Sequence, residues 1–505
     1  MTQFRPETVI LNWLIALPFF AALCAEVLPR LRLPGRLAEE VEPLRRAPFA
    51  LGALLSGLGI GVGAFLLVSV RAGGDLGADY WWTRELYHMR FRADVLTAAA
   101  VAAVHAAGLL VHLHMAGLPP LRDSHHRAAL VLLGQGCAAA ACLSADLIAL
   151  LFFLQTAVVT LWMLARLDDR RAAGWMLMWA YAAGLLLTLG VLLMWQHAGD
   201  TAIPALPLLM VGAETPALRD ICVLVILGLL PLVLGVPAHR WLLGLSLHAP
   251  LAGYASAVLL PLVGGVAILR LLPGAIALPL TTAAAPLGFV LGAAALIWGA
   301  LRALLARELR HLAAWLSVMQ AGPLLIALAA TASPRATPEL TAAAVLHVMV
   351  APLGIAALWS ASGAVRAAVG TDALAALSGL AGRMRMPGVA LLLGGASLAG
   401  LPLLPGFLVQ RHLLTALLAG GHIWAVVVIL CADALALVAV LNALRLAFLR
   451  AGPPPSLRWS SPAASVQLGL VILALVGLGV AGGPLGRWSD GTVRSVLSAA
   501  RSSAP

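Results

Sequence analysis

The chain has 505 residues, of which 62% are hydrophobic and only 10% are charged. Because soluble domains carry about a quarter charged residues, this composition excludes a soluble enzyme or a soluble binding domain. The formal net charge is +11, but the basic residues stand in short loops between apolar runs, which excludes a nucleic-acid-binding patch.

Apolar runs of about 18 to 25 residues, each long enough to cross a bilayer as a helix, follow one another along the chain. We predict an all-α polytopic membrane protein with about 14 transmembrane helices, forming a single transmembrane domain over residues 1–505 in contact with lipid. Helices 1–3 are expected within residues 9–116, helices 4–8 within 127–270, helices 9–13 within 278–449 and helix 14 at 464–482. The first apolar run lacks the residue order of a cleaved signal peptide, so we expect it to be a retained helix.

The distribution of arginine predicts the orientation. All 32 basic residues are arginine, so the chain contains no lysine. Positive residues near helix ends favour the cytoplasm. The connections after odd-numbered helices contain Arg30, Arg32, Arg36, Arg45, Arg46, Arg122, Arg127, Arg166, Arg170, Arg171, Arg240, Arg302, Arg307, Arg310, Arg366, Arg383, Arg385, Arg445, Arg450 and Arg458. The other side holds the remaining 12, and we predict that both termini lie outside.

Charged residues near the predicted helix ends have simple structural interpretations. Asp94 precedes the third helix and is expected to cap its N-terminus. Long arginine side chains near a helix end extend toward the membrane surface. We expect this arrangement for Arg270, Arg302, Arg307 and Arg310.

No pattern for a catalytic residue, cofactor or metal is found. The five cysteines lie inside apolar runs without CxxC or Cys/His spacing, which is typical of packing residues. There is no glycine-rich dinucleotide turn and no cysteine cluster for an iron–sulfur centre. The cysteines are Cys24, Cys137, Cys142, Cys222 and Cys431.

Two apolar segments are interrupted by helix-breaking residues in mid-span. Such breaks are tolerated where the freed backbone is buried or lines a cavity. Two breaks about five helices apart suit two repeats of opposite orientation, each with an ion or substrate path. Two unrelated proline kinks remain the alternative. The residues are Pro231, Gly235 and Pro237 in the first segment and Pro402, Pro405 and Gly406 in the second.

Motifs around these breaks resemble a known family. The stretch from Pro237 to Gly253, with its P-x-H-x-W-L and later A-P-x-A-G, is similar to a link in the antiporter-like subunits of the respiratory complex I superfamily, of the NADH:quinone oxidoreductase chain M, N and L type. Residues 306–326, 377–387 and 397–407 resemble three further motifs of this family, and FRAD at 91–94 resembles the opening of its third helix.

The resemblance implies 14 helices with two inverted five-helix repeats, helices 4–8 and 9–13, each with a broken helix. It also implies proton or sodium translocation within a multisubunit complex in a bacterial inner membrane. The implied partners are other membrane subunits and, through the complex, a peripheral redox or carbonic-anhydrase-like module. Membrane-bound hydrogenases, formate hydrogenlyases and inorganic-carbon uptake complexes contain related subunits.

Ionisable residues of the family's presumed proton path are replaced in this chain. Protons need buried titratable groups as stepping stones, and an amide or alkyl side chain does not titrate near neutral pH. On helix 8 the corresponding position falls at Pro261 or Leu262. The other replaced positions are Gln155, Leu232, Gln320, Ile355 and Gln410.

Five other residues are candidates for an ion path. His347 matches a family histidine, and Asp433 is an acid within an apolar run, where acids face a cavity or a partner. His105 and His112 share a face of helix 3, and His239 lies in the link. Each also has a structural interpretation, as a packing, hydrogen-bonding or loop-fixing residue.

Three functions therefore remain open. The first is a membrane scaffold within a complex I-type assembly, whose own ion path is degenerate. The second is an active cation-translocating subunit that uses His347, Asp433 and the helix 3 histidines. The third is a carrier for a small neutral or anionic solute, with a polar cavity built from Gln155, Gln320 and Gln410.

Overall fold

The computed structural model describes residues 6–27, 42–83, 87–205, 215–275, 279–333, 335–453 and 455–502. Of the features considered above, the loop arginines Arg30, Arg32 and Arg36 lie outside these ranges, as does residue 278, the expected start of helix 9.

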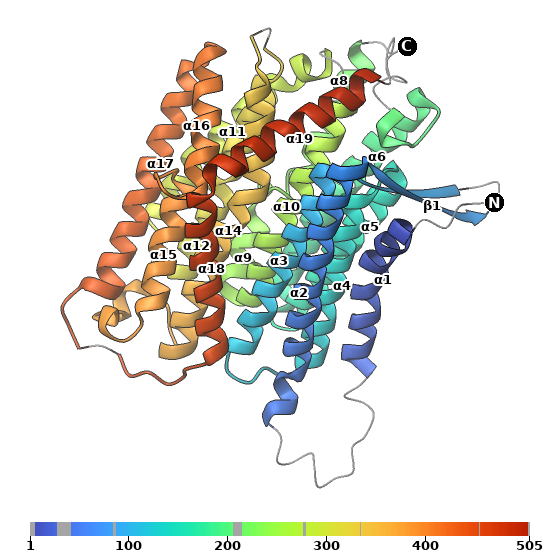
Figure 1. Ribbon diagram of the computed structural model, residues 1–505. Helices are drawn as coiled ribbons and strands as arrows, with labels where there is room; N and C mark the ends of the chain where they lie inside the picture. The colour runs from blue at the N-terminus through green and yellow to red at the C-terminus, as the bar shows by residue number, and fades with distance from the viewer. Residues whose placement is uncertain are drawn as a thin grey trace.

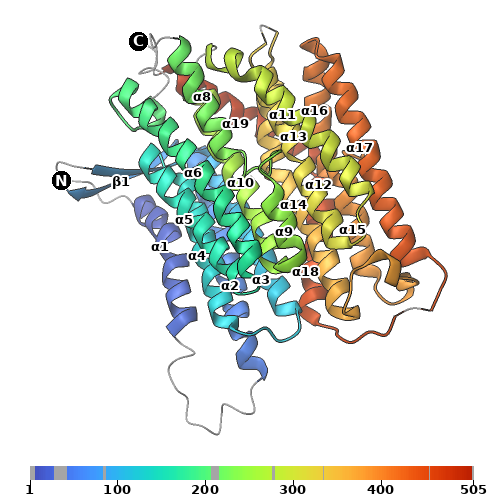
Figure 2. The same ribbon diagram turned by 180° about the vertical axis from the view of Figure 1, so that it is seen from behind.

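The described chain is a bundle of long helices that run side by side (Figures 1 and 2). Eleven of its helical segments are long and apolar enough to cross a membrane. Together with α1 and two interrupted helices, these described segments make up the 14 transmembrane elements that were predicted. The helices of the first half are α1 (Pro6–Val27), α2 (Glu42–Gly73), α3 (Val95–Gly117), α4 (Ser124–Leu143), α5 (Leu147–Arg166), α6 (Arg170–Ala198), α8 (Thr215–Leu229), α9 (Arg240–His248) and α10 (Pro250–Ala275).

The second half continues the bundle on its other side (Figure 2). Its helices are α11 (Pro279–Leu304), α12 (Leu309–Met319), α13 (Ala321–Ala330), α14 (Pro338–Val369), α15 (Arg385–Leu398), α16 (Pro405–Ala419), α17 (Ile423–Leu444), α18 (Pro462–Val480) and α19 (Gly482–Ser502). Short turns of helix lie at η2 (Ile203–Ala205), η3 (Leu374–Ala376), η4 (Leu380–Gly382) and η5 (Arg445–Leu449).

The first interruption separates α8 from α9. Pro231 has no backbone N–H to donate, so regular helix ends at Leu229, and the Gly235 N–H reaches back to the Leu230 carbonyl over 2.8 Å. The sequence predicted a helix ending at residue 236 followed by a link. The structure instead resumes the helix at Arg240, because the prolines lie N-terminal to an uninterrupted helix-forming stretch.

The second interruption lies between α15 and α16 and has a related geometry. The Leu401 N–H reaches back to the Ala396 carbonyl over 2.9 Å. Leu403 has a φ of 69°, and Leu234 in the first break has a φ of 62°. Pro405 then begins α16, where a missing N–H costs no helical hydrogen bond. Both breaks therefore occur where the prolines and glycines predicted them.

Two elements were not expected from the sequence. Strands β1 (Leu76–Thr83) and β2 (Tyr87–Ala93) form an antiparallel hairpin before α3. Helix α19 follows α18 and lies obliquely across the bundle (Figure 1), packing on α14 and α16. The hairpin was missed because only apolar runs long enough to span a bilayer were assigned, and residues 91–93, related to the opening of the third helix, belong to β2. Helix α19 was missed because it is too polar to span a bilayer.

Helices α10 and α14 lie in the buried centre together with the α12–α13 segment, and α10 and α14 pack on each other. Asp94 caps α3 as predicted, accepting from the Thr97 N–H over 2.8 Å. Arg270 lies near the end of α10, and its side chain has partners within the protein. Its guanidinium donates to the carbonyl oxygens of Cys142 and Ser144 at the end of α4, because unpaired helix carbonyls are favourable partners for a cation.

Candidate functional site

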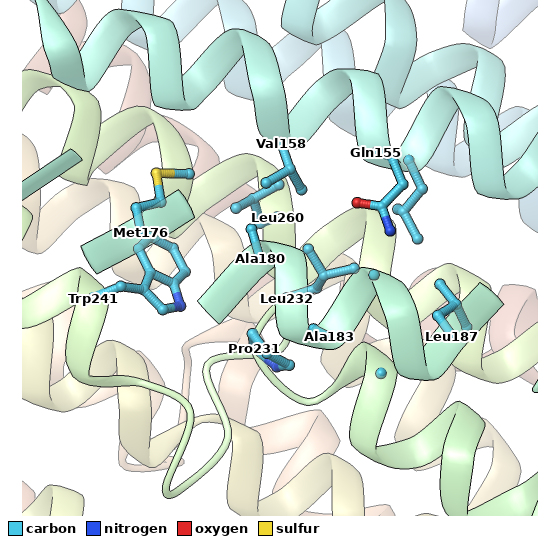
Figure 3. A pocket seen from close by; sticks show the side chains of 13 residues that line it. Gln155, Val158, Met176, Ala180, Ala183, Leu187, Pro231, Leu232, Trp241 and Leu260 are labelled. Carbon is cyan, nitrogen blue, oxygen red and sulfur yellow. The ribbon is translucent and has the colours of Figure 1, made fainter. Parts of the chain in front are cut away.

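The first interruption borders a small pocket between α5, α6 and α10 (Figure 3). Gln155 comes from α5 and Leu232 from the interruption, and both line this pocket. The structure therefore brings together two of the replaced family positions that are 77 residues apart in the sequence. For helix 8, the pocket wall contains Leu260 rather than the expected Pro261 or Leu262.

The side chains that line this pocket are almost entirely apolar. The remaining lining includes Leu154, Val158, Met176, Leu187 and Trp241. Gly184 of α6 leaves room for the Gln155 amide, since a Cβ there would lie 2.4 Å from Nε2. Gln155 can donate and accept hydrogen bonds but cannot exchange a proton near neutral pH. The pocket therefore offers no titratable group for a proton.

Gln320 and His347 meet at the joint between α12 and α13. The His347 Nε2 lies 2.7 Å from the Gln320 carbonyl oxygen. Because a carbonyl only accepts, Nε2 carries the proton and donates here. The Gln320 side chain does not take part, and its Nε2 is buried without a partner. This hydrogen bond connects α14 to the joint between α12 and α13.

The remaining replaced position on α14 is Ile355. Its side chain is 1% exposed and belongs to the main apolar core. It lies two turns of helix after His347 with no titratable residue between them. No ionisable residue follows His347 within the two helical turns that lead to Ile355.

Gln410 and Asp433 form a buried polar pair beside the second interruption. The Gln410 Nε2 donates to Asp433 Oδ2 over 2.9 Å. Gln410 Oε1 and Asp433 Oδ1 are both buried without a partner. Gly400 leaves room for Gln410, because a Cβ there would lie 2.3 Å from its Cγ. Asp433 is thus a carboxyl group delivered by α17 to a replaced position on α16.

The helix 3 histidines are packed against glycines of α2. A Cβ on Gly59 would lie 2.4 Å from the His105 ring, and one on Gly52 would lie 2.1 Å from the His112 ring. His112 Nδ1 bonds to the Gly108 carbonyl over 2.8 Å. His105 Nδ1 bonds to the Gln135 amide. The two glycines on α2 are seven residues apart, as are the two histidines on α3. Each histidine ring therefore occupies the space that one glycine leaves.

His239 lies in the link, immediately before α9, and its side chain is buried. Its ring lies 5.3 Å from the Trp315 ring, and its Nδ1 has no partner. The interruption therefore folds into the protein, where the ring contributes to packing between α9 and α12.

A buried polar network at the centre of the bundle was not found from the sequence. Gln467 of α18 donates to the hydroxyls of Ser360 over 2.7 Å and Tyr254 over 3.1 Å. His114 Nδ1 lies 3.3 Å from Gln467 Oε1. The signal was Gln467 itself, the one amide in an otherwise apolar helical run. Its partners come from three other helices, so the sequence could not assemble them.

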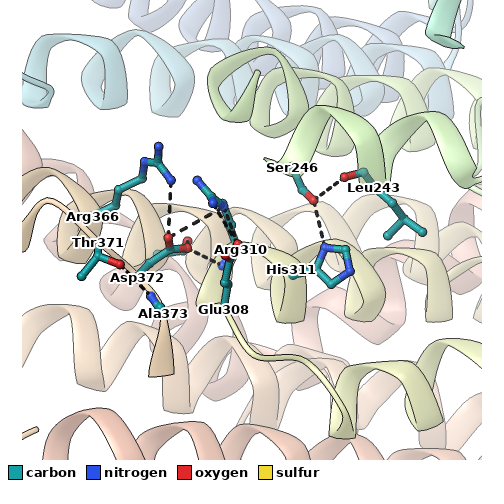
Figure 4. Close-up of polar contacts among 10 residues, drawn as sticks. Leu243, Ser246, Glu308, Arg310, His311, Arg366, Thr371, Asp372 and Ala373 are labelled. Carbon is teal, nitrogen blue, oxygen red and sulfur yellow. Dashed lines mark hydrogen bonds and ion pairs between the residues drawn. The ribbon is translucent and has the colours of Figure 1, made fainter. Parts of the chain in front are cut away.

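Arg310, in the first turn of α12, lies within a cluster of ion pairs (Figure 4). Its guanidinium lies 2.8 Å from Glu308 and 3.7 Å from Asp372, and its side chain is only 11% exposed. Arg366 approaches the same Asp372 carboxylate at 3.5 Å. Asp372 follows α14, and burial raises the pKa of its carboxyl above 3.8, against the lowering effect of the Arg310 N–H and charge.

Gln155 does not share its pocket at the first interruption with the other two glutamines of the expected polar cavity. Gln155 lines the pocket at the first interruption, whose lining contains neither Gln320 nor Gln410. Gln410 pairs with Asp433 instead. The three amides therefore stand in three different environments.

Comparison with known proteins places this geometry in a family. The family model described as NADH:quinone oxidoreductase/Mrp antiporter, TM, matches residues 144–436. The matched region begins before α5 and ends within α17, so it includes both interruptions and the Gln410–Asp433 pair.

Individual relatives agree with this match. F(420)H(2) dehydrogenase subunit M of Methanosarcina mazei is 28% identical over 278 residues, covering 49% of this chain and 54% of the relative, about half its length. NADH-quinone oxidoreductase subunit N of Desulforudis audaxviator is 28% identical over 477 residues, covering 89% of this chain and 88% of the relative.

The fold also matches a solved structure. A chain of the Mrp complex from Dietzia superposes with a TM-score of 0.83 at 19% identity, covering 98% of both chains. At that identity the likeness concerns the fold alone. With the family match over residues 144–436, it shows that the chain belongs to the NADH:quinone oxidoreductase/Mrp antiporter transmembrane family.

Proposed function

We propose that this chain is a multi-pass membrane subunit of a multisubunit energy-converting complex, in which it acts mainly as a scaffold. The observation that carries the proposal is the pocket at Gln155 and Leu232. The two positions, which resemble ionisable positions of the family, line one pocket, yet neither side chain titrates. The pocket therefore keeps the two positions together but has no titratable group among its lining residues.

The second half supports the same conclusion. His347 donates to a backbone carbonyl, and Ile355 belongs to the core. A proton entering at His347 would find no titratable side chain between it and Ile355 on α14. Both interrupted helices then act as structural joints within two repeats of opposite orientation, helices 4–8 and 9–13.

The complex would contain further membrane subunits and a peripheral module. The relatives' names mention NADH-quinone oxidoreductase and F(420)H(2) dehydrogenase, and the structural neighbour belongs to an Mrp complex. Gentle detergent extraction and mass spectrometry of the co-purified proteins test this. A redox, carbonic-anhydrase-like or antiporter partner supports the proposal and identifies the kind of complex to which the chain belongs. A chain that purifies alone and takes up a solute in vesicles contradicts it.

A second candidate function rests on Asp433. A buried acid with one unpartnered oxygen beside a helix break suits a proton or sodium site. In that case the second half would translocate a cation through Asp433 and His347 without the ionisable residues that are replaced in this chain. Loss of translocation in a variant lacking both groups would favour this candidate over the scaffold.

The membrane and the orientation also belong to the proposal. We infer a bacterial inner membrane with both termini outside, from the excess of arginine in the connections after odd-numbered helices. Single cysteines placed near each terminus should react with an impermeant thiol reagent added to whole spheroplasts. Labelling only after the membrane is opened would contradict this orientation.

A further inference from the structure

A cluster of three potential metal ligands lies away from both interruptions. Glu26 stands near the end of α1, and His125 and His126 stand in the first turn of α4. One ligand atom from each residue lies within 4.8 Å of the other two. The end of α1 and the start of α4 lie at the same end of the bundle (Figure 2).

The three side chains are partly accessible to solvent. Glu26 is 24% exposed and His126 is 39% exposed, so an ion can reach them without crossing the core. The His126 Nδ1 lies 2.6 Å from Glu26 Oε2, and the His125 and His126 rings are 4.3 Å apart. Two imidazoles and one carboxylate already converge on one point of the surface.

We propose that Glu26, His125 and His126 bind a divalent transition-metal ion of the Zn²⁺ type, which fastens α1 to α4. Two histidines and one glutamate are a known ligand set for zinc, with a fourth position for water. Imidazole nitrogens favour zinc over the hard cations that prefer oxygen ligands alone. This site is independent of the scaffold role proposed above.

The geometry needs only side-chain adjustment. Ligands at about 2.0–2.1 Å from a tetrahedral zinc lie roughly 3.3 Å apart. The Glu26 and His126 atoms must therefore separate slightly while His125 approaches. The neighbouring cation does not oppose this, because Arg127 Nη2 pairs with Asp168 over 2.6 Å.

A simple hydrogen bond between Glu26 and His126 is the competing interpretation. The two interpretations differ at His125, which the hydrogen bond does not need. Removing its imidazole leaves the Glu26–His126 contact in place but removes one of three metal ligands.

The test uses the full chain, or its complex, purified without a histidine tag and stripped with a chelator. Equilibrium dialysis against ZnCl₂ with elemental analysis gives bound zinc per chain. We expect one zinc that is lost, or bound at least about tenfold more weakly, in His125→Ala, His126→Ala and Glu26→Gln. His197→Ala removes an exposed histidine near the end of α6 and is the matched control.

Two further measurements distinguish a loss of metal binding from a loss of folding. Size-exclusion chromatography shows whether each variant remains monodisperse, and His125→Ala keeps the native hydrogen bond in any case. Co²⁺ should give visible absorption bands with the unaltered chain that disappear in His125→Ala. His197→Ala should bind zinc as the unaltered chain does. Zinc binding that is equal in the unaltered chain and His125→Ala, or no zinc bound by either the unaltered chain or His197→Ala, overturns the proposal.

Discussion

The Gln410 side-chain amide donates a hydrogen bond to Asp433 Oδ2 over 2.9 Å, joining α16 to α17. Both side chains are buried, at 7% and 6% exposure. No ion pair reaches Asp433 from any residue that the structure describes. The buried carboxyl group therefore depends on one amide donor, which makes the pair a sensitive point in the second half of the bundle.

Replacing Gln410 by leucine should destabilise the protein more than replacing Asp433 by asparagine. Gln410→Leu leaves a buried carboxyl group without a donor, at a cost of about 1–3 kcal/mol. Asp433→Asn keeps an oxygen that can accept from Gln410. Thermal unfolding in detergent measures both, with the exposed Gln196→Leu as control. Equal losses for the two variants would contradict this order, and no loss in Gln410→Leu would show that the hydrogen bond contributes nothing to stability.

A pair of substitutions tests whether the first pocket still has the geometry of an ion-pair site. Leu232→Lys alone places an amine at a position that is 7% exposed, and we expect a loss of several kcal/mol. Adding Gln155→Glu should recover part of this loss, because both side chains line one pocket. Unfolding measurements on the two single variants and the double variant give the coupling free energy.

A coupling free energy near zero in this cycle would contradict the geometry. The two positions would then not face each other closely enough to pair. Recovery in the double variant, without any gain of ion translocation, would agree with a scaffold whose path is interrupted at further positions.

Gly406 should not tolerate even one added methyl group. A Cβ at this position would lie 1.7 Å from the Ser397 carbonyl oxygen, at the close approach of α15 and α16. We expect Gly406→Ala to lower the yield of folded protein severely. Gly477→Ala on α18 is the control, because a Cβ there meets nothing within 4 Å. Fluorescence-detection size-exclusion chromatography compares the two, and equal profiles would contradict the packing.

The sequence predicted much of this fold and less of the site. Prolines and glycines act locally, so Pro231 and Pro405 marked the interruptions correctly. Asp94 was likewise identified as a cap because capping depends on the next three residues. By contrast, contacts between helices depend on which helices are neighbours. Examples are the Gln410–Asp433 pair, the Gln467 network and the hydrogen bonds from Arg270 to the end of α4. That information lies in packing between distant segments, and hydropathy does not contain it.

The Asp372 cluster should make stability depend on pH. Because burial raises the pKa of this carboxyl in the folded protein, the unfolded chain releases its proton at a lower pH than the folded chain. The free energy of unfolding should therefore decrease as pH rises from 3.8 through the raised value. Asp372→Asn should flatten this dependence, which unfolding at a series of pH values measures. An unchanged slope in Asp372→Asn would assign it to other groups.

The scaffold role is tested most directly by proton translocation in the intact complex carrying both His347→Ala and Asp433→Asn. These substitutions remove the two buried titratable groups beside replaced family positions in the second half. Translocation is measured in vesicles by a pH-sensitive dye, with assembly checked by native electrophoresis. The account predicts normal assembly and unchanged translocation. Normal assembly with a large loss of translocation would contradict it and assign the ion path to this chain.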